Sequence, residues 1–441
     1  MATLDTEPIF PHDLRDAWPA LSRDERVESF KLVPHATADD FFLSLSAQEQ
    51  SDLILALAPG ERRTWMRLLA PDDAVDVVQS SPHEARESLL QELDETTRRE
   101  VLALLAYAED DAGGLMNPRF ARVRPEMTID EAISYLRRQT REKVETVYYA
   151  YVLDAQQHLL GVASLRQLFQ AAPDKRVADV MSRDLVTVAE DTDQEVVGRH
   201  FAEQGLMAIP VVDAENRMKG IVTVDDIVQV VQEEATEDIQ KVGGMEALDA
   251  PYFEVTFPAM LKKRAGWLLI LFLSEMLTAT AMGYFEEEIS KAVVLALFVP
   301  LIISSGGNSG SQATTLIIRS MALSEVRLRD WWRVARREVM AGLSLGLTLG
   351  VVGLMRILVW QGLHFYNYGP NYLLVGMTVG LSLVGVVMWG TLSGSMLPFV
   401  LRRLGFDPAS ASAPFVATLV DVSGLVIYFT VASLILRGTL L

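Results

Sequence analysis

The chain has 441 residues, of which 50% are hydrophobic and 22% are charged, and this mixture predicts a soluble part joined to a membrane part. Residues 1–261 carry 49 acidic and 25 basic side chains, whereas residues 262–441 carry 9 and 14. So acidic a first part argues against a nucleic-acid partner, because phosphate contacts need basic side chains. Because the chain contains no cysteine, disulfides and thiolate metal sites are excluded.

The first region is expected to be helical and cytoplasmic. The N-terminus lacks a basic segment followed by an apolar core, so we expect no cleavable signal peptide. Residues 1 to about 40 are weakly patterned and predict a partly ordered lead-in. From residue 40 to about 108, apolar residues recur at helical spacing between prolines, which predicts a stack of short helices. We assign residues 1–112 to this helical domain, in which nothing indicates catalysis.

Two similar units follow, each with the order β-α-β-β-α. The first closes on Gly161-Val162-Ala163-Ser164, and the second on Gly220-Ile221-Val222-Thr223. Such an internal repeat indicates a pair of homologous modules. The pair, over residues 113–233, resembles tandem CBS domains, which often bind adenine nucleotides. That resemblance makes Thr223 and Asp226 candidates for an ATP ribose, although the same residues also suit a helix N-terminus.

A connecting segment joins these modules to the membrane part. Its apolar pattern from Ile227 to about Tyr252 predicts a helix, and we assign residues 234–261 to this connection. Acidic residues at one-turn spacing repel one another on this helix, so cations or facing bases would stabilise it. A solvated linker is the alternative interpretation.

Hydropathy predicts an all-α membrane domain, residues 262–441, with five spans at about 265–285, 293–318, 338–362, 372–400 and 414–436. Basic residues gather before the first span, between the second and third, and after the fourth. This distribution places the N-terminus on the cytoplasmic side of the cell membrane and the C-terminus on the outer side. Because five is an odd number, a two-fold homodimer is a natural way to close a pore around an axis.

The second span contains an unusually polar stretch, Ser304 to Gln312. Polar side chains in lipid are costly, so they belong against protein or a water-filled cavity. Close helix packing explains the glycines of this stretch but explains Asn308 and Gln312 less well. We therefore predict a lined pathway whose residues are Gly306, Gly307, Asn308, Gln312 and Thr418.

Asp421 lies well inside the fifth span, which is otherwise free of charge. An unpaired carboxylate there costs several kcal/mol, and Arg356, the one basic candidate partner, is expected near the outer end of the third span. We therefore predict that Asp421 binds a cation, with Glu275 as a weaker second candidate. Oxygen ligands without sulfur suit a hard divalent ion such as Mg²⁺, and Ca²⁺ or Mn²⁺ would satisfy the same chemistry.

With these residues in view, the chain from about residue 40 onward resembles the MgtE family of magnesium channels and transporters. The matching motifs are Ala112-Gly113-Gly114-Leu115-Met116, Val222–Asp226, Ala235–Ile239, Gly306-Gly307-Asn308 with Gln312, and Val416–Asp421 followed by Ser423-Gly424-Leu425. The resemblance implies a homodimer in which Asp421 selects Mg²⁺. It also implies that cytosolic Mg²⁺ closes the pore by binding to acidic residues of the soluble part, namely Asp193, Glu195, Asp226, Glu234, Glu237 and Asp238.

Three positions depart from the family pattern: Gly205, Ser311 and Ala413-Pro414. The first replaces an acidic sensor residue, and the last lies where an asparagine is common, so both imply weaker cation binding on the cytoplasmic side. Two other functions stay open, a sodium- or proton-coupled divalent cation transporter and a non-conducting membrane sensor. An enzyme is not expected, because no nucleophile–base pair or phosphate-binding loop is present.

Overall fold

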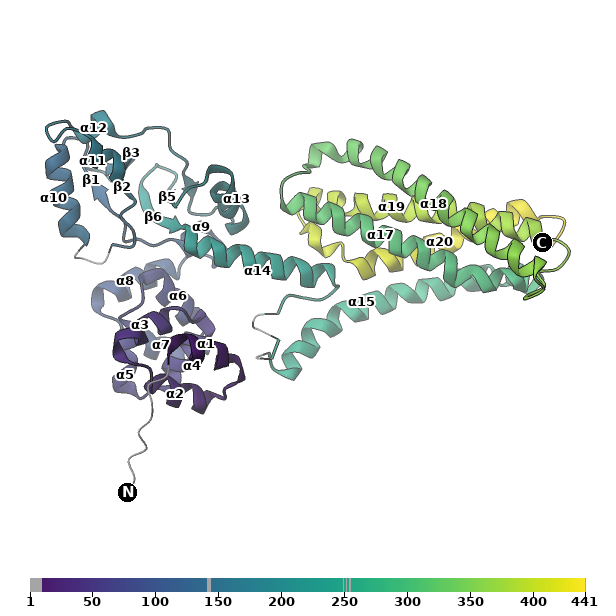
Figure 1. The fold of residues 1–441 in the computed structure, drawn as a ribbon, viewed down its shortest axis with the longest axis horizontal. Coiled ribbons are helices and arrows are strands. Elements are labelled where there is room, and N and C mark those ends of the chain that lie inside the picture. Colours follow the sequence, from purple (N-terminus) through teal and green to yellow (C-terminus); the bar gives the residue numbers. More distant parts are fainter. Residues whose placement is uncertain (1–9, 141–143, 249, 251, 254, 441) are drawn as a thin grey trace, which may run out of the picture. The chain divides into compact units, whose positions relative to one another are not determined.

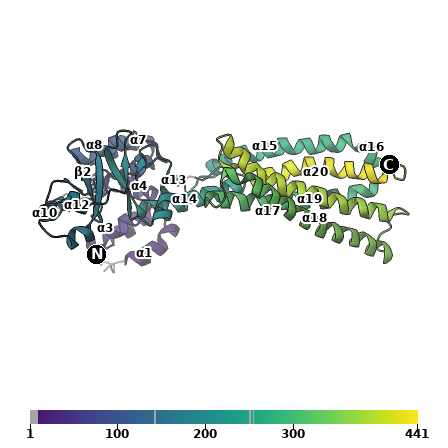
Figure 2. The same ribbon diagram turned by 90° about the horizontal axis from the view of Figure 1, so that it is seen from above.

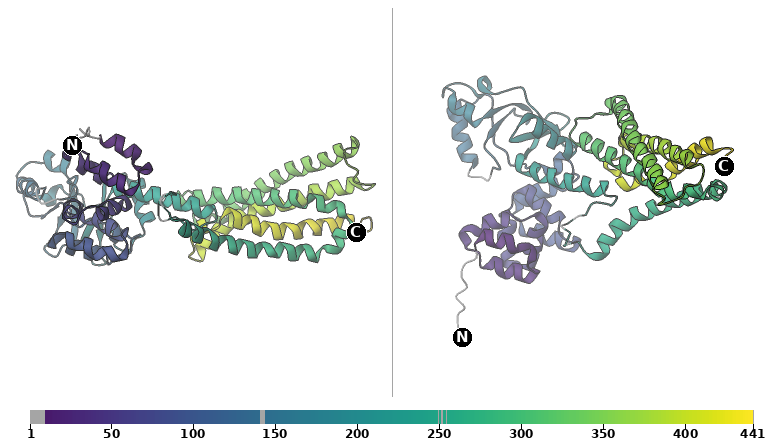
Figure 3. Two further views of the ribbon diagram at one scale, coloured as in Figure 1. Left: turned by 90° about the horizontal axis from the view of Figure 1, so that it is seen from below. Right: turned by 45° about the vertical axis from the view of Figure 1, so that its right-hand side comes forward.

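The computed structural model describes residues 10–140, 144–248, 250, 252–253 and 255–440. It contains two compact units, Met1–Glu233 and Glu234–Leu441 (Figure 1). The first unit holds short helices and two small sheets, and the second consists of long helices, as Figure 2 and Figure 3 also show.

Short helices build the first domain of the first unit. They are α1 (Pro11–Ala17), α2 (Arg23–Lys31), α3 (His35–Leu43), α4 (Ala47–Ala56), α5 (Pro59–Met66), α6 (Pro71–Gln79), α7 (His83–Glu92) and α8 (Glu95–Leu104). Their starts follow local chemistry, since Ser22 and Ser46 each accept a hydrogen bond from the backbone three residues on. The predicted lead-in contains helices from Pro11 onward, whereas its residues 1–9 lie outside the described part of the chain.

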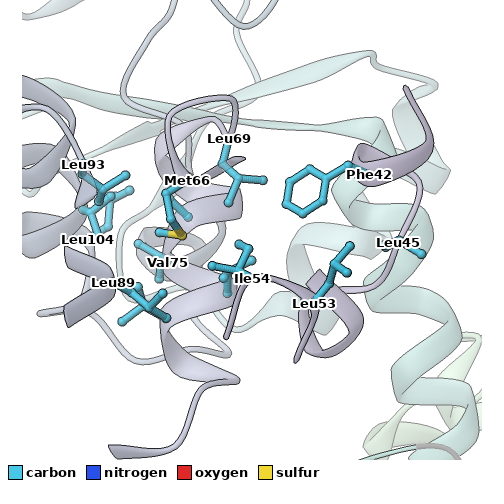
Figure 4. Packing of buried hydrophobic residues seen from close by; sticks show 14 of the residues in the cluster. Phe42, Leu45, Leu53, Ile54, Met66, Leu69, Val75, Leu89, Leu93 and Leu104 are labelled. Carbon is cyan, nitrogen blue, oxygen red and sulfur yellow. The ribbon is translucent and has the colours of Figure 1, made fainter. Parts of the chain in front are cut away.

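A continuous apolar core joins these helices. Phe42, Ile54, Met66 and Leu89 are fully buried and point toward one another between the helices (Figure 4). The same core extends to Val197 and Ile209 of the second CBS-like module. This shared core fixes the position of α6 and α8 against that module, which matters for the acidic site described below.

The two predicted β-α-β-β-α modules are confirmed. The first contains α9 (Ala112–Leu115), β1 (Arg122–Val123), α10 (Ile129–Gln139), β2 (Tyr149–Leu153), β3 (Leu159–Ser164) and α11 (Leu165–Gln170); α12 (Val177–Val180) follows. The second contains β4 (Val188–Ala189), α13 (Gln194–Gln204), β5 (Ala208–Val212), β6 (Met218–Thr223) and the start of α14. In each module the first strand is parallel to the second, and the second is antiparallel to the third.

The connecting helix α14 spans Val224–Val242 and ends earlier than predicted. The expected helix to Tyr252 is interrupted at Gly243-Gly244, where Gly244 has a φ of 77°. Glycine adopts this left-handed conformation at little cost and commonly ends helices. A side chain at Gly244 would also lie 3.1 Å from atoms of Pro414 and Trp267, so the chain turns here in tight contact with the membrane domain.

All five predicted membrane spans are present as helices long and apolar enough to cross a bilayer. The membrane domain contains α15 (Phe257–Tyr284), α16 (Glu286–Lys291), η3 (Val293–Phe298), α17 (Val299–Ala322), η4 (Leu328–Asp330), α18 (Trp331–Gly362), α19 (Tyr372–Arg403), η5 (Pro408–Ser410) and α20 (Ala413–Leu436). Helices α17, α19 and α20 pack against one another, α18 packs on α19, and α15 lies along α20 (Figure 2).

Glycines set the close approach of these helices. A side chain at Gly306 would meet Val386 at 2.5 Å and Val420 at 2.8 Å, and one at Gly310 would meet Gly390 at 2.9 Å. Gly306 and Gly307 are buried within the single chain. Small residues that let helix backbones approach are typical of membrane domains. Gly306 is therefore required for the close packing of these helices, and the place of the two glycines on a pathway lining stays a prediction.

A paired substitution separates packing from other roles of the Gly306-Gly307 motif. We expect Gly306→Ala to lower the stability of the solubilised protein by about 1–3 kcal/mol, because the added methyl group overpacks the contact with Val386 and Val420. Gly307→Ala is the control, since its methyl group would lie 3.4 Å from Ala417, an ordinary contact. Thermal unfolding followed by size-exclusion chromatography measures both, and equal losses would contradict the packing role.

Candidate functional site

A polar face on α17 is exposed in the single chain. Ser304, Asn308, Gln312 and Thr315 recur every three or four residues and all remain exposed. Asn308 is 3.5 Å from the Ser304 hydroxyl along the same helix. Because lipid satisfies no polar group, this face requires water or protein against it. Asn308 and Gln312 therefore remain candidates for the lining of a polar pathway.

Several other polar residues of the membrane domain form hydrogen bonds inside the helix bundle. Thr418, a predicted lining residue, is buried and donates a hydrogen bond to the Pro414 carbonyl at 3.0 Å. Ser309 and Thr391 share a 2.7 Å hydrogen bond between α17 and α19. Ser311 donates to the Ala413 carbonyl at 3.1 Å. The Ser309–Thr391 and Ser311–Ala413 hydrogen bonds join helices, as hydroxyl groups commonly do in membrane domains, whereas that of Thr418 stays within α20.

Asp421 is half-buried on α20, the helix against which α15 and α17 pack. Among the described residues, no basic side chain lies within 4.0 Å of its carboxylate. Arg356 is instead held over the rings of Phe298 and Trp360, at 5.7 and 5.5 Å, so it is not the partner of Asp421. The charge of Glu275 on α15 acts on Asp421, which places two carboxylates rather than an ion pair in this region.

A second site lies in the first unit, where α6 and α8 meet the CBS-like modules. Asn117 is completely buried at its centre and donates hydrogen bonds to Asp72 at 2.9 Å and to Glu145 at 2.8 Å. Next to it, Arg119 donates to Glu100 at 2.7 Å and to Thr97 at 2.7 Å. These polar contacts join the helical domain to the first module.

The carboxylates of this site, which we call the acidic junction, are Asp72, Asp73, Asp76, Glu145, Asp225 and Asp226. Burial, followed by the charges of the other members, raises the pKa of Asp226 to about 6 and that of Glu145 to about 7. The crowded surroundings of Asp76, followed by the charges of Asp73 and Asp226, raise its pKa to about 8, although the residue is exposed at the surface of the unit. Crowded carboxylates repel one another, so a cation would stabilise this packing.

The sequence analysis missed most of the acidic junction. Of its six carboxylates the sequence analysis singled out Asp226 alone, and it named no individual carboxylate of the helical domain. Asp72 and Asp76 lie four residues apart on α6, a like-charge spacing that could have drawn attention to them. In the described part of the chain, no three acidic or histidine side chains converge as a complete metal site. A cation held here would therefore keep some of its own water ligands, as Mg²⁺ commonly does.

The other predicted cation ligands of the first unit, Asp193 and Glu195, lie at the start of α13. Asp193 caps α13 by accepting a hydrogen bond from the Glu195 backbone at 2.9 Å, and both side chains are exposed. Gly205 has a φ of 63° at the end of α13, so a glycine suits that turn. Cation binding by Asp193 and Glu195 stays a prediction.

Thr223 and Asp226, the predicted nucleotide ligands, bind each other. The Thr223 hydroxyl donates to the Asp226 carboxylate at 2.8 Å at the start of α14. Ser164 and Gln167 form the equivalent pair at the start of α11. Both pairs act as helix N-caps, as the alternative interpretation of the sequence proposed.

The remaining predicted ligands, Glu234, Glu237 and Asp238, belong to the second unit near the end of α14. Burial, followed by the charges of Asp407 and Glu234, raises the pKa of Asp238 to about 6. Glu237 forms an ion pair with Lys241, one turn further along the helix. The acidic residues here therefore already face one basic side chain, which is one of the two stabilising partners that the sequence analysis expected.

The raised pKa values of the acidic junction predict a pH dependence of stability. Protonation favours the packed junction, so stability without divalent ions should fall as the pH rises from about 4 through about 8. We expect the unfolding temperature of Mg²⁺-free protein to drop by at least about 3 °C between pH 6 and pH 8.5. Asp76→Asn should flatten this slope, whereas the exposed Glu126→Gln should not. Differential scanning fluorimetry measures both, and a stability that increases over this interval would contradict the prediction.

Comparison with known proteins covers nearly the whole chain. The profile of a divalent cation transporter, MgtE, matches residues 299–431, the MgtE intracellular N domain matches residues 9–110, and the CBS domain matches residues 112–174 and 177–233. The magnesium transporter MgtE of Thermus thermophilus is 43% identical over 98% of this chain and 94% of its own length. The Enterococcus faecalis protein of that name is 32% identical over 77% of this chain and 72% of its own length.

Solved structures match the first half of the chain. The crystal structure of the cytosolic domain of the Mg²⁺ channel MgtE in complex with ATP is 42% identical, with a TM-score of 0.47. The match covers 50% of this chain and 90% of that one. The soluble part of a magnesium transporter is 27% identical, covers 51% of this chain and 93% of that one, and has a TM-score of 0.41.

Proposed function

We propose that this chain, which belongs to the MgtE family of magnesium transporters, is a Mg²⁺ channel with its pore between two copies of the chain. The chain is a multi-pass membrane protein with a soluble N-terminal half, and the relatives that it matches over most of their length are named magnesium transporters. Magnesium transport follows from the family. The channel mechanism, the dimeric pore and its closure by cytosolic Mg²⁺ are the additions that we propose.

The observation that carries the pore is the exposed polar face of α17 beside the helix that holds Asp421. Asn308 and Gln312 cannot face lipid without a cost of several kcal/mol each. A second copy of the chain, related by a two-fold axis, would place two such faces and two Asp421 carboxylates around one water-filled path. Rings of carboxylates are a common means of selecting cations.

Magnesium suits this arrangement for a chemical reason. Mg²⁺ dehydrates reluctantly and is usually held by one or two carboxylates through a nearly complete shell of water. Two Asp421 side chains with the amides of Asn308 and Gln312 would bind the hydrated ion without replacing its water. Residues 1–261 carry the acidic excess of the chain, and this excess would attract cations to the cytoplasmic side.

Closure would use the acidic junction of the soluble half and the acidic end of α14. Their packed forms crowd carboxylates together, so a divalent cation would favour the packed form over an open one. A ligand shifts such an equilibrium only by its difference in affinity between the two forms. A rising concentration of cytosolic Mg²⁺ would therefore close the pore, and loss of Mg²⁺ would open it.

A nucleotide at the CBS modules is a weaker candidate. CBS pairs commonly offer a hydroxyl and a carboxylate to a ribose, and Thr223 with Asp226 would supply them here. The same two side chains already bind each other, so ATP would have to replace the 2.8 Å hydrogen bond between them. Calorimetric titration of ATP into the full chain, with Thr223→Ala as the comparison, tests this binding.

Uptake into proteoliposomes tests the channel. The purified chain is reconstituted with a Mg²⁺-sensitive dye inside, and uptake is measured with and without gradients of Na⁺ and H⁺. A channel gives uptake driven by the Mg²⁺ gradient and the membrane potential alone. Uptake that requires Na⁺ or H⁺ would instead establish a coupled transporter, and no uptake would favour a non-conducting sensor.

A further inference from the structure

The end of α14 is held against the loop between α19 and α20 by a single ammonium group. The Nζ atom of Lys241 lies 2.6 Å from Oδ2 of Asp407, which belongs to that loop. The same Nζ atom forms an ion pair with Glu237 on its own helix. All three residues belong to the second unit, so this contact lies within one compact body.

The loop that receives Lys241 leads directly into the helix that carries Asp421. Asp407 uses its other oxygen, Oδ1, to accept a 2.8 Å hydrogen bond from the Ala409 backbone, which orders the short helix η5. Ser412 then caps α20 and accepts a hydrogen bond from the Trp267 indole at 3.1 Å. Movement of Asp407 would therefore reach the start of α20 through only a few ordered residues.

Apolar contacts bring α14 to the same place. Val242 packs against a cluster formed by Ile318, Ala409 and Ala411. The turn at Gly244 meets Pro414 and Trp267. The end of α14 thus lies on η5 and on the first turn of α20, and Lys241 supplies the polar part of this contact.

Lys241 is the basic group among four carboxylates. Asp407, Glu234 and Glu237 all act on Asp238, and Lys241 opposes their effect. Burial lowers the pKa of Lys241, but the hydrogen bonds to Asp407 and Glu237 outweigh burial and raise it overall. The ammonium group therefore stays charged throughout the physiological pH range. Without it, the acidic end of α14 would face Asp407 with like charges only.

We propose that Lys241 is a built-in cation that bridges α14 to the α19–α20 loop and holds the closed form of the pore in part without Mg²⁺. This proposal rests on the proposed function, since it assumes that α14 closes the channel. It implies two cations of different origin at one contact. The ammonium group of Lys241 stabilises the contact of α14 with the loop at low Mg²⁺. At higher concentrations, free Mg²⁺ stabilises the same contact further by binding to the carboxylates.

The test uses Lys241→Gln, with Lys262→Gln as the control that removes an exposed positive charge just before the first span. Amide hydrogen exchange of residues 237–243 is measured on the full chain in Mg²⁺-free buffer. For a partly exposed ion pair we expect exchange to be about threefold to tenfold faster in Lys241→Gln and unchanged in Lys262→Gln. Asp407→Asn, which keeps the oxygen that caps η5, should have the same effect, and the double variant should add nothing further.

Uptake by the same proteins completes the test. We expect Lys241→Gln to take up Mg²⁺ faster at low internal Mg²⁺ and to need a roughly threefold higher internal concentration to close. Unchanged exchange in Lys241→Gln overturns the bridge itself. Faster exchange with unchanged closing concentration overturns its role in closure. If the unsubstituted chain shows no response to internal Mg²⁺, the proposed function fails, while the exchange rates still decide whether the bridge exists.

Discussion

Asp421→Asn is expected to abolish Mg²⁺ uptake while the protein stays folded. The substitution keeps the size of the side chain and removes its charge, so the pore loses the group that offsets the cost of bringing a divalent ion into the membrane. Loss of a few kcal/mol of cation stabilisation corresponds to at least about a hundredfold lower rate of uptake. Dye-based uptake into proteoliposomes, beside thermal unfolding of the same preparation, measures both quantities.

Two further variants show whether the charge or the packing of Asp421 is responsible. Asp421→Glu retains the carboxylate and should keep part of the uptake, because the charge is still present although displaced. Glu275→Gln removes the second carboxylate whose charge acts on Asp421, and it should reduce uptake less than Asp421→Asn does. Normal uptake by Asp421→Asn would contradict the pore assignment, whatever the stability of the variant.

The architecture of this chain could be predicted from local patterns. The five spans are recognisable because each needs about 20 apolar residues in succession. The two modules are recognisable because their strand and helix order repeats within a short length. The early end of α14 was also visible in principle, since Gly243-Gly244 is a strong signal for a helix end. Here the apolar spacing on either side outweighed the glycines and led to the wrong boundary.

The functional contacts were harder to predict because they join residues far apart in the chain. Asp72 on α6 and Glu145 in the loop before β2 are joined by hydrogen bonds from Asn117, which lies in a third part of the chain. Lys241 and Asp407 come together only after the membrane helices have packed. No spacing rule relates such residues, whereas Asp421 was conspicuous because one charge stood alone in an apolar span. For Gly306 the sequence allowed both packing and lining, and the neighbouring Val386 shows that packing requires a glycine there.

Neutralising the acidic junction is expected to remove most of the response to cytosolic Mg²⁺. In the double variant Asp72→Asn, Glu145→Gln, the amide groups retain oxygen acceptors for Asn117, but two of the repelling charges are gone. Mg²⁺ then has fewer carboxylates to bind and less repulsion to relieve, so its affinity differs less between the packed and open forms. If millimolar internal Mg²⁺ lowers the uptake rate of the unsubstituted chain by more than about tenfold, it should lower the uptake rate of the variant by less than about threefold.

The sign of this prediction does not depend on which form the variant prefers. Loss of repulsion could favour the packed form even without Mg²⁺, whereas loss of a ligand could favour the open form, yet both reduce the difference that Mg²⁺ makes. The same reasoning applies to stability, so the rise in unfolding temperature on addition of Mg²⁺ should shrink in parallel. Glu126→Gln, an exposed residue of the first module, should leave both responses intact. A full Mg²⁺ response in the double variant would show that closure works through other carboxylates, of which those at the end of α14 are the next to test.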